Sequence, residues 1–221
     1  LSFQEGLFYI QDEGSQLVSH ALNPVPGTTV IDANAAPGGK STHLAQLMRN
    51  RGTIIAGDIH PGRLELIKAN CQRLGVNCVQ TVLLDARELG SCYPEAADYL
   101  LIDAPCSGLG VLRRRADARW RKELARVREL AQLQLEILLG ARQTLKPGGF
   151  LVYSTCSLDP EENQQVVRQF LAEANEFRLV PLELLFMPDD LQATARQGWI
   201  QFLPQRHGTD GFFISRLQKL R

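Results

Sequence analysis

Short apolar runs alternate with longer segments of helical periodicity along most of the chain. The apolar runs are β-branched, have the length of strands, and cover residues 27–33, 53–58, 78–85, 97–105 and 150–156. The segments with helical spacing cover residues 41–50, 61–75, 118–145 and 161–174. Two further strand candidates, 199–204 and 210–218, follow them. The pattern predicts strands and helices in alternation.

This alternation predicts an α/β fold with a doubly wound, mostly parallel sheet and helices on both faces. Pro61 near a helix start and Gly75 at its end mark one helix, and Lys146-Pro147-Gly148-Gly149 ends another. We interpret residues 27–221 as one catalytic domain. Residues 1–26 are expected to be a lead-in segment that packs on it.

Composition excludes several classes of protein. The formal net charge is +0, so any nucleic-acid binding must come from a local basic patch. No apolar run reaches membrane-spanning length, and no secretory signal is visible. The five cysteines include no C-x-x-C pair and the four histidines are scattered, which argues against a disulfide framework or a metal site. We expect a cytoplasmic monomer. Because the first residue is Leu1, we interpret the chain as part of a longer protein.

Chemically useful side chains follow every predicted strand of the main sheet. The first three strands end at Asp32, Asp58 and Asp85, the fourth runs into Asp103 and Cys106, and the fifth into Cys156. Ligands of doubly wound sheets lie beyond the carboxyl ends of the strands. Acids at strand ends can also serve as caps of loops and helices. Four acids and two cysteines at one edge favour a functional site over caps alone.

The stretch DANAAPGGKST, residues 32–42, resembles the end of a nucleotide-binding P-loop, but Asn34 occupies the place of its first glycine. Asp58 lies about twenty residues beyond the glycines, where dinucleotide folds place the acid that binds ribose hydroxyls. A P-loop nucleoside triphosphatase and an NAD oxidoreductase remain the rivals from the residues alone.

Cys106 and Cys156 follow the fourth and fifth strands, which are usually neighbours in doubly wound sheets. They are therefore expected to face each other across the ligand crevice. A buried, inert thiol is the commoner fate of a single cysteine. Two at the same edge favour chemistry.

The chain resembles the RNA (cytosine-C5) methyltransferases that use S-adenosylmethionine. The motifs that carry the resemblance are GLFYIQDEGSQLV, AAPGGKST, DIHPGRL, DAPCSGLG, YSTCSLDPEEN and RHGTDGFF, and together they span nearly the whole chain. The resemblance implies a Rossmann-like class I S-adenosylmethionine-dependent fold and no metal. It is strongest to the enzymes that modify 16S ribosomal RNA, whose members carry an additional N-terminal RNA-binding domain. A tRNA cytosine-C5 methyltransferase and a non-catalytic RNA-binding factor on the same scaffold are the alternatives.

The resemblance also assigns roles. Cys156 is the nucleophile that adds to cytosine C6, and Cys106 assists proton removal and product release. Asp103 hydrogen-bonds the cytosine ring, and Lys40 contacts the base or Asp103. The family usually has a cysteine where this chain has Asn34.

The expected cofactor is S-adenosylmethionine. Asp58 is expected to bind the ribose, Asp85 the adenine amino group, and Arg63 to pair with an acid near the ribose or to remain a solvated helix charge. The candidate cofactor-binding residues are Asn34, Ala35, Ala36, Pro37, Gly38, Gly39, Lys40, Asp58, Arg63, Asp85 and Asp103.

A basic segment, residues 113–122, directly follows the Cys106 loop. Guanidinium groups there could bind phosphates and an aromatic ring could stack on a base. The alternative is a solvated helix face. The candidate RNA-binding residues are Arg113, Arg114, Arg115, Arg119, Trp120 and Arg121. The expected partner is RNA, with 16S ribosomal RNA favoured.

Overall fold

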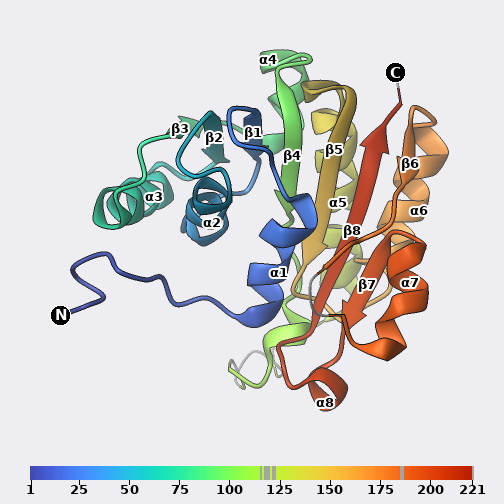
Figure 1. Cartoon of the computed structure of the whole chain (residues 1–221). Helices are drawn as coiled ribbons and strands as arrows, with labels where there is room; N and C mark the ends of the chain where they lie inside the picture. Colours follow the sequence, from blue (N-terminus) through green and yellow to red (C-terminus); the bar gives the residue numbers. More distant parts are fainter. Residues whose placement is uncertain (115, 117–119, 121–122, 185–186, 221) are drawn as a thin grey trace.

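The computed structural model describes residues 1–114, 116, 120, 123–184 and 187–220. Within these residues the strands form a single sheet in the order β3-β2-β1-β4-β5-β8-β6, with β7 also paired to β8 (Figure 1). The strands are β1 Thr29–Asp32, β2 Thr53–Asp58, β3 Val79–Leu83, β4 Ala97–Asp103, β5 Leu145–Thr155, β6 Phe177–Leu179, β7 Trp199–Phe202 and β8 Phe212–Lys219. Strands β1 to β5 are parallel, and β8 is antiparallel to β5, β6 and β7. The predicted doubly wound, mostly parallel fold is confirmed.

Helices cover both faces of the sheet because neighbouring residues of each strand point to opposite sides. The helices are α1 Glu13–Leu22, α2 Gly39–Leu47, α3 Pro61–Leu74, α4 Leu89–Cys92, α5 Leu124–Ala141, α6 Gln164–Glu173, α7 Gln192–Arg196 and α8 Pro204–His207. Leu100 and Leu151 pack in the core beneath α5 and α6. Leu101 and Val152, the next residue in each strand, pack beneath α1 and α2.

Helix α1 occupies part of the expected lead-in segment. Asp12 caps it by accepting a hydrogen bond from the Gly14 amide at 2.9 Å. Val18 and Leu22, one helical turn apart, are fully buried against the sheet. A capping acid followed by buried apolar residues four positions apart is a sequence signal for a helix. No helix was predicted here from the apolar pattern.

The bounds of α5 and β5, the helix and the strand that follow β4, differ from the predicted ones. The predicted helix 118–145 is realised as α5 from Leu124 to Ala141, and residues 117–119 and 121–122 lie outside the described residues. Strand β5 begins at Leu145, not at residue 150, because Leu145 already pairs with Ala97. Residues 146–149 then bulge, with Gly148 at a φ of 81°, before regular pairing resumes at Phe150.

Strand β8 lies inside the sheet although it follows the other described strands in sequence. It pairs along its length with β5, from Phe150–Gln218 to Thr155–Phe213. Its other edge pairs with β7 and β6. The loop before β8 therefore reaches the carboxyl end of β5 (Figure 1), since Thr155, the residue before Cys156, pairs with Phe213.

Candidate active site

The carboxyl ends of β1, β4 and β5 are adjacent because these strands pair directly in parallel. The loop after β1 leads into α2, which carries Lys40 in its first turn. The loops after β4 and β5 carry Cys106 and Cys156. Three separate segments thus deliver their side chains to one place, as the doubly wound topology requires.

The two cysteine sulfurs lie 3.3 Å apart, within hydrogen-bonding distance of each other. Both side chains are only partly buried, and neither forms a disulfide. Cys106 and Cys156 therefore face each other as predicted, because the strands before them, β4 and β5, are neighbours.

Asp103 is held between two donors beside this pair. Lys40 Nζ donates to Asp103 Oδ2 at 2.6 Å, and Ser154 Oγ donates to Asp103 Oδ1 at 2.8 Å. Burial by itself would lower the pKa of Lys40, but the negative charge of Asp103 and its hydrogen bond keep that pKa above the ordinary value. Lys40 is thus a fixed positive charge at the site.

The two thiols have opposite environments. The hydrogen bond between the two sulfurs, with Cys106 as the donor, lowers the pKa of Cys156. Burial and the negative charge of Asp103 oppose this effect, and the smaller effect of Lys40 supports it. The same hydrogen bond, with burial and the negative charges of Cys156 and Glu162, raises the pKa of Cys106 well above its ordinary value. A thiolate is the reactive form of cysteine. These directions agree with the roles that the resemblance implies, with Cys156 as the nucleophile and Cys106 as its protonated neighbour.

The loop of residues 32–39 is shaped by backbone contacts and has unsatisfied polar atoms. Gly38 has a φ of 101° and precedes α2, without a side-chain cap. Asp32 Oδ1 and Asn34 Oδ1 are buried without a hydrogen-bond partner among the described residues. Buried polar atoms are normally paired. The orphaned oxygens show that the loop has hydrogen-bonding capacity left for a ligand, so the residues present fit a bound cofactor.

Asp58 and Arg63 lie at the end of β2 and the start of α3. Asp58 is buried, its Oδ1 accepts from the His60 amide at 2.9 Å, and its Oδ2 lies 3.5 Å from Arg63 Nη1. Arg63 Nη2 also donates to Ala36 O at 3.0 Å, in the loop after β1. The pairing of Arg63 with an acid is present.

Asp85 has a partner that the sequence analysis did not assign. Arg87 donates to both of its oxygens through the side chain and to Oδ1 through its amide. These contacts lower the pKa of Asp85, mainly through the side-chain hydrogen bond. An adenine amino group would share this carboxylate with Arg87.

The buried carboxyl of Asp32 makes the stability of the protein depend on pH. Burial raises its pKa from 3.8 to about 7, although Ser41 Oγ donates to it at 2.7 Å. Between about pH 4 and pH 7 the unfolded chain has lost this proton and the folded chain keeps it. The contribution of Asp32 to the free energy of unfolding is therefore largest below about pH 4, and it is lost as the pH rises to about 7.

We expect Asp32→Asn to remove this decline. Its free energy of unfolding should exceed that of the wild type increasingly from pH 5 to pH 8, by a difference on the order of a few kcal/mol. Urea unfolding at several pH values measures it. Parallel curves for the two proteins at all pH values would contradict the assignment.

Gly110 and Gly211 join the Cys106 loop to the loop before β8. The Gly110 amide donates to Cys156 O at 2.8 Å, and the Gly211 amide donates to Gly110 O at 2.9 Å. A Cβ at Gly110 would lie 2.0 Å from Gly211 O and 2.8 Å from Cys156 O, both backbone atoms. The two loops can approach this closely only without a side chain at position 110.

We expect Gly110→Ala to cost roughly 1–3 kcal/mol of stability, as other overpacked positions do, and to displace Cys156. Thermal unfolding and thiol alkylation measure the two effects. Gly62→Ala is the matched control, since a Cβ there meets nothing within 4 Å. Equal behaviour of the two variants would show that the contact is dispensable.

Arg113 and Arg114 are engaged in ion pairs within the protein. Arg113 Nε donates to Asp210 Oδ1, and Arg114 pairs with both Asp12 and Asp210. These pairs fasten the segment after Cys106 to the N-cap of α1 and to the loop before β8. The sequence analysis did not assign this role, because the partners lie about a hundred residues away in both directions.

Of the other candidate RNA-binding residues, Trp120 is 83% exposed. Arg115, Arg119 and Arg121, also predicted to bind RNA, lie outside the described residues. RNA contact by this segment stays a prediction.

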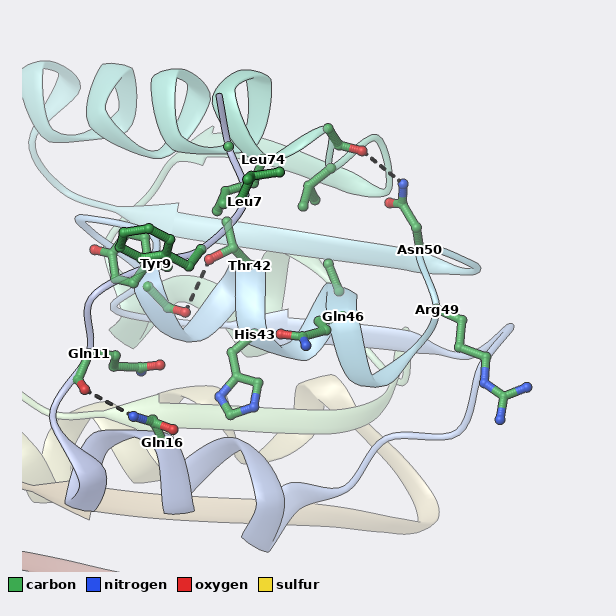
Figure 2. A pocket seen from close by; sticks show the side chains of 16 residues that line it. Leu7, Tyr9, Gln11, Gln16, Thr42, His43, Gln46, Arg49, Asn50 and Leu74 are labelled. Atoms are coloured by element: carbon green, nitrogen blue, oxygen red, sulfur yellow. Dashed lines mark hydrogen bonds between the residues drawn. The ribbon is translucent and has the colours of Figure 1, made fainter. Parts of the chain in front are cut away.

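The cavity between residues 6–11, α2 and residues 74–76 is distinct from the cysteine site. It has a volume of about 470 Å³, with Tyr9 at one end and His43 and Gln46 on the α2 side (Figure 2). It shares only Gly39 with the cofactor loop and contains neither cysteine. We therefore do not assign the chemistry to this cavity.

No group of three or more potential ligands placed to hold a metal ion occurs in the described part of the chain. None of the helices in that part is both long and apolar enough to cross a membrane.

Comparison with known proteins adds a family match. The profile described as "16S rRNA methyltransferase RsmB/F" matches residues 19–218. The chain is 43% identical over 219 residues to the probable ribosomal RNA small subunit methyltransferase B of Bacillus subtilis, covering 98% of this chain and 49% of the relative. It is 40% identical over 227 residues to the ribosomal RNA small subunit methyltransferase F of Pectobacterium atrosepticum, covering 99% and 46%. The crystal structure of NSun6 from Pyrococcus horikoshii with SFG has a TM-score of 0.89 at 36% identity, covering 100% of this chain and 55% of that one.

Proposed function

The chain belongs to the RsmB/F family of 16S rRNA methyltransferases, and from this membership we propose that it transfers a methyl group from S-adenosylmethionine to C5 of a cytosine in RNA through a covalent bond to Cys156. The chain spans about half the length of the curated relatives it matches. The proposal is therefore made for the catalytic domain, and it extends to the whole protein only through this domain.

The observation that carries the proposal is the cysteine pair. Two sulfurs 3.3 Å apart lie beside the Lys40–Asp103 ion pair, at the strand ends next to the cofactor loop. A simple binding module has no need for two thiols in contact beside a Lys–Asp ion pair at the ligand edge of the sheet.

Covalent addition overcomes the low nucleophilicity of cytosine C5. The Cys156 thiolate forms a bond to C6, and the electron pair of the C5–C6 double bond makes C5 nucleophilic. Asp103, oriented by Lys40 and Ser154, is placed to hydrogen-bond the ring as charge develops on it. S-adenosylmethionine, when bound, supplies an electrophilic methyl group.

Product release requires removal of the C5 proton and rupture of the C6–sulfur bond. Once Cys156 is bonded to carbon, it no longer carries a negative charge or accepts the hydrogen bond from Cys106. Those are two of the causes that hold the pKa of Cys106 high. Cys106 then ionises more readily and can accept the C5 proton, while Cys156 leaves as a thiolate. Overall, one proton is released for each methyl group transferred.

The cofactor is proposed to bind along the loop after β1 and at Asp58. Support comes from the orphaned oxygens of Asp32 and Asn34, and from the SFG, an S-adenosylmethionine analogue, in the NSun6 structure. Among the described residues, Asp58 Oδ2 accepts no backbone amide and lies 3.5 Å from Arg63 Nη1.

We expect Asp58→Asn to weaken S-adenosylhomocysteine binding by about 1.5–3 kcal/mol, the usual range for losing a hydrogen bond to a charged group. This equals roughly 10- to 150-fold in Kd. Isothermal calorimetry measures it, with Glu65→Gln as control because Glu65 is an exposed acid on the nearby helix α3. An unchanged Kd in Asp58→Asn would remove Asp58 from the cofactor site.

Calorimetry of the isolated chain also tests the rival functions. Binding of S-adenosylhomocysteine without a metal, and none of ATP or NAD, is expected. Preferential binding of ATP with magnesium would favour a nucleoside triphosphatase and overturn the proposal. Cofactor binding without methylation of any RNA would favour a non-catalytic RNA-binding factor.

The proposed substrate is 16S ribosomal RNA. The names of the relatives in Bacillus subtilis and Pectobacterium atrosepticum support this choice over tRNA. Bisulfite sequencing of total RNA from cells with and without the full-length gene tests it. Loss of 5-methylcytosine from tRNA alone would identify the alternative substrate.

A further inference from the structure

The loops of the two cysteines are linked through one buried acid. A serine follows each cysteine, Ser107 after Cys106 and Ser157 after Cys156. Glu162 accepts from the Ser107 amide at 2.7 Å, from Ser107 Oγ at 2.5 Å and from Ser157 Oγ. The two serine hydroxyls also lie 3.2 Å apart. A single carboxylate therefore connects the two cysteine loops through the serine that follows each cysteine.

Glu162 is itself fixed from two further elements. Gln134 of α5 donates to Glu162 Oε1 at 3.2 Å and to Pro105 O at 2.9 Å. The Tyr153 hydroxyl of β5 donates to the backbone oxygen of Glu162 at 2.6 Å. Glu162, Gln134 and Tyr153 have no exposed surface. The carboxylate cannot move without disturbing the Cys106 loop.

Stability alone does not explain why an acid is buried at this position. Removing a charge from water costs several kcal/mol, and well-packed apolar residues often stabilise a protein equally well. Four donors directed at its two oxygens offset that cost and keep the charge at this point. A fixed negative charge here acts on the thiols.

The charged and titratable groups that face the cysteine pair are unevenly placed. Lys40 lowers the pKa of Cys156, while Glu162 contributes to the raised pKa of Cys106. Asp103, which pairs with Lys40, raises the pKa of Cys156 and so opposes Lys40. The Tyr153 hydroxyl stays protonated because burial raises its pKa. Asp32 acts on Lys40 from the cofactor loop. The hydrogen bond from Cys106 thus favours a thiolate at Cys156, and the charge of Glu162 disfavours one at Cys106.

We propose that Glu162 is a positioning residue that clamps the two cysteine loops through Ser107 and Ser157 and directs the negative charge of the pair to Cys156. The inference rests on the proposed function for its meaning, but it concerns the free protein and requires neither RNA nor cofactor to be tested.

The test is the order of alkylation of the two thiols. The reduced, desalted chain is treated with iodoacetamide at low conversion from pH 5.5 to pH 9, and the Cys106 and Cys156 peptides are quantified by mass spectrometry. In the wild type Cys156 should react first. In Glu162→Gln the pH midpoint of Cys106 should move down, and the Cys156-to-Cys106 ratio at pH 7 should fall roughly 3- to 10-fold, as for a pKa change of about half to one unit.

The matched control is Glu161→Gln, which removes the neighbouring acid. Glu161 is partly exposed and pairs with Arg128 at 3.4 Å, so its loss should leave the ratio unchanged. A folded Glu162→Gln protein with the wild-type ratio and midpoints would overturn the inference. If Glu162→Gln does not fold, Ser157→Ala removes one clamp donor, and an unchanged ratio in that variant overturns it equally.

The outcome separates this inference from the proposed function. A changed ratio in Glu162→Gln, with no methylation by the wild-type protein, would leave the clamp standing and reject the function. Methylation by the wild type with no change in the ratio would reject the clamp alone.

Discussion

Cys156→Ala is expected to lose RNA methylation by a factor on the order of 10⁴ or more, as for the removal of other covalent nucleophiles. Without this sulfur no bond to cytosine C6 forms and C5 stays a poor nucleophile. Incorporation of a labelled methyl group into RNA measures the loss. The variant should also give no protein–RNA adduct on a denaturing gel.

Cys92→Ala is the matched control for this result, because Cys92 is exposed and lies on α4, away from the site. Its activity should equal that of the wild type. S-adenosylhomocysteine affinity should be unchanged in Cys156→Ala, which separates loss of chemistry from loss of fold. Methylation retained in Cys156→Ala would remove covalent catalysis by this residue from the mechanism.

Cys106→Ala is expected to trap the reaction after methyl transfer. The bond from Cys156 to C6 still forms, but proton removal from C5 stalls, so a protein–RNA adduct should accumulate and depend on S-adenosylmethionine. Because Cys106 no longer donates to Cys156, the pKa of Cys156 rises. Adduct formation should therefore be slower at low pH than at high pH.

A denaturing gel over a range of pH measures this adduct. An adduct in Cys156→Ala with none in Cys106→Ala would reverse the two roles. Normal turnover by Cys106→Ala, with no adduct, would show that another group removes the proton.

The sequence predicted the site where it depended on strand order. Short, β-branched apolar runs located the parallel strands, and the parallel topology places their carboxyl ends at one edge. Cys106 and Cys156 meet for this reason, although fifty residues separate them. The Lys40–Asp103 contact follows from the same rule, since β1 and β4 are neighbours.

Contacts made by loops were beyond such reasoning. Nothing in the local sequence indicates that Arg113 and Arg114 bind Asp12 and Asp210, because loop conformation, not periodicity, brings these segments together. The same holds for Glu162, which follows the YSTCS stretch by a few residues and reads as an exposed acid at a helix start. Burial of the acid is visible only after both cysteine loops are placed around it.

The position of β8 inside the sheet has a consequence for the protein during its synthesis. A chain is made from its N-terminus at about 5–20 residues per second, so roughly 3–13 seconds separate Cys156 from the end of β8 at Lys219. During that interval the edge of β5 is unpaired and Gly110 has no Gly211 to bond. A nascent chain that has not yet made β8 thus carries both cysteines but lacks the backbone contact of Gly211 with the Cys106 loop. An unpaired strand edge can pair with another chain, so the open β5 edge is where we expect such a nascent chain to need chaperone protection.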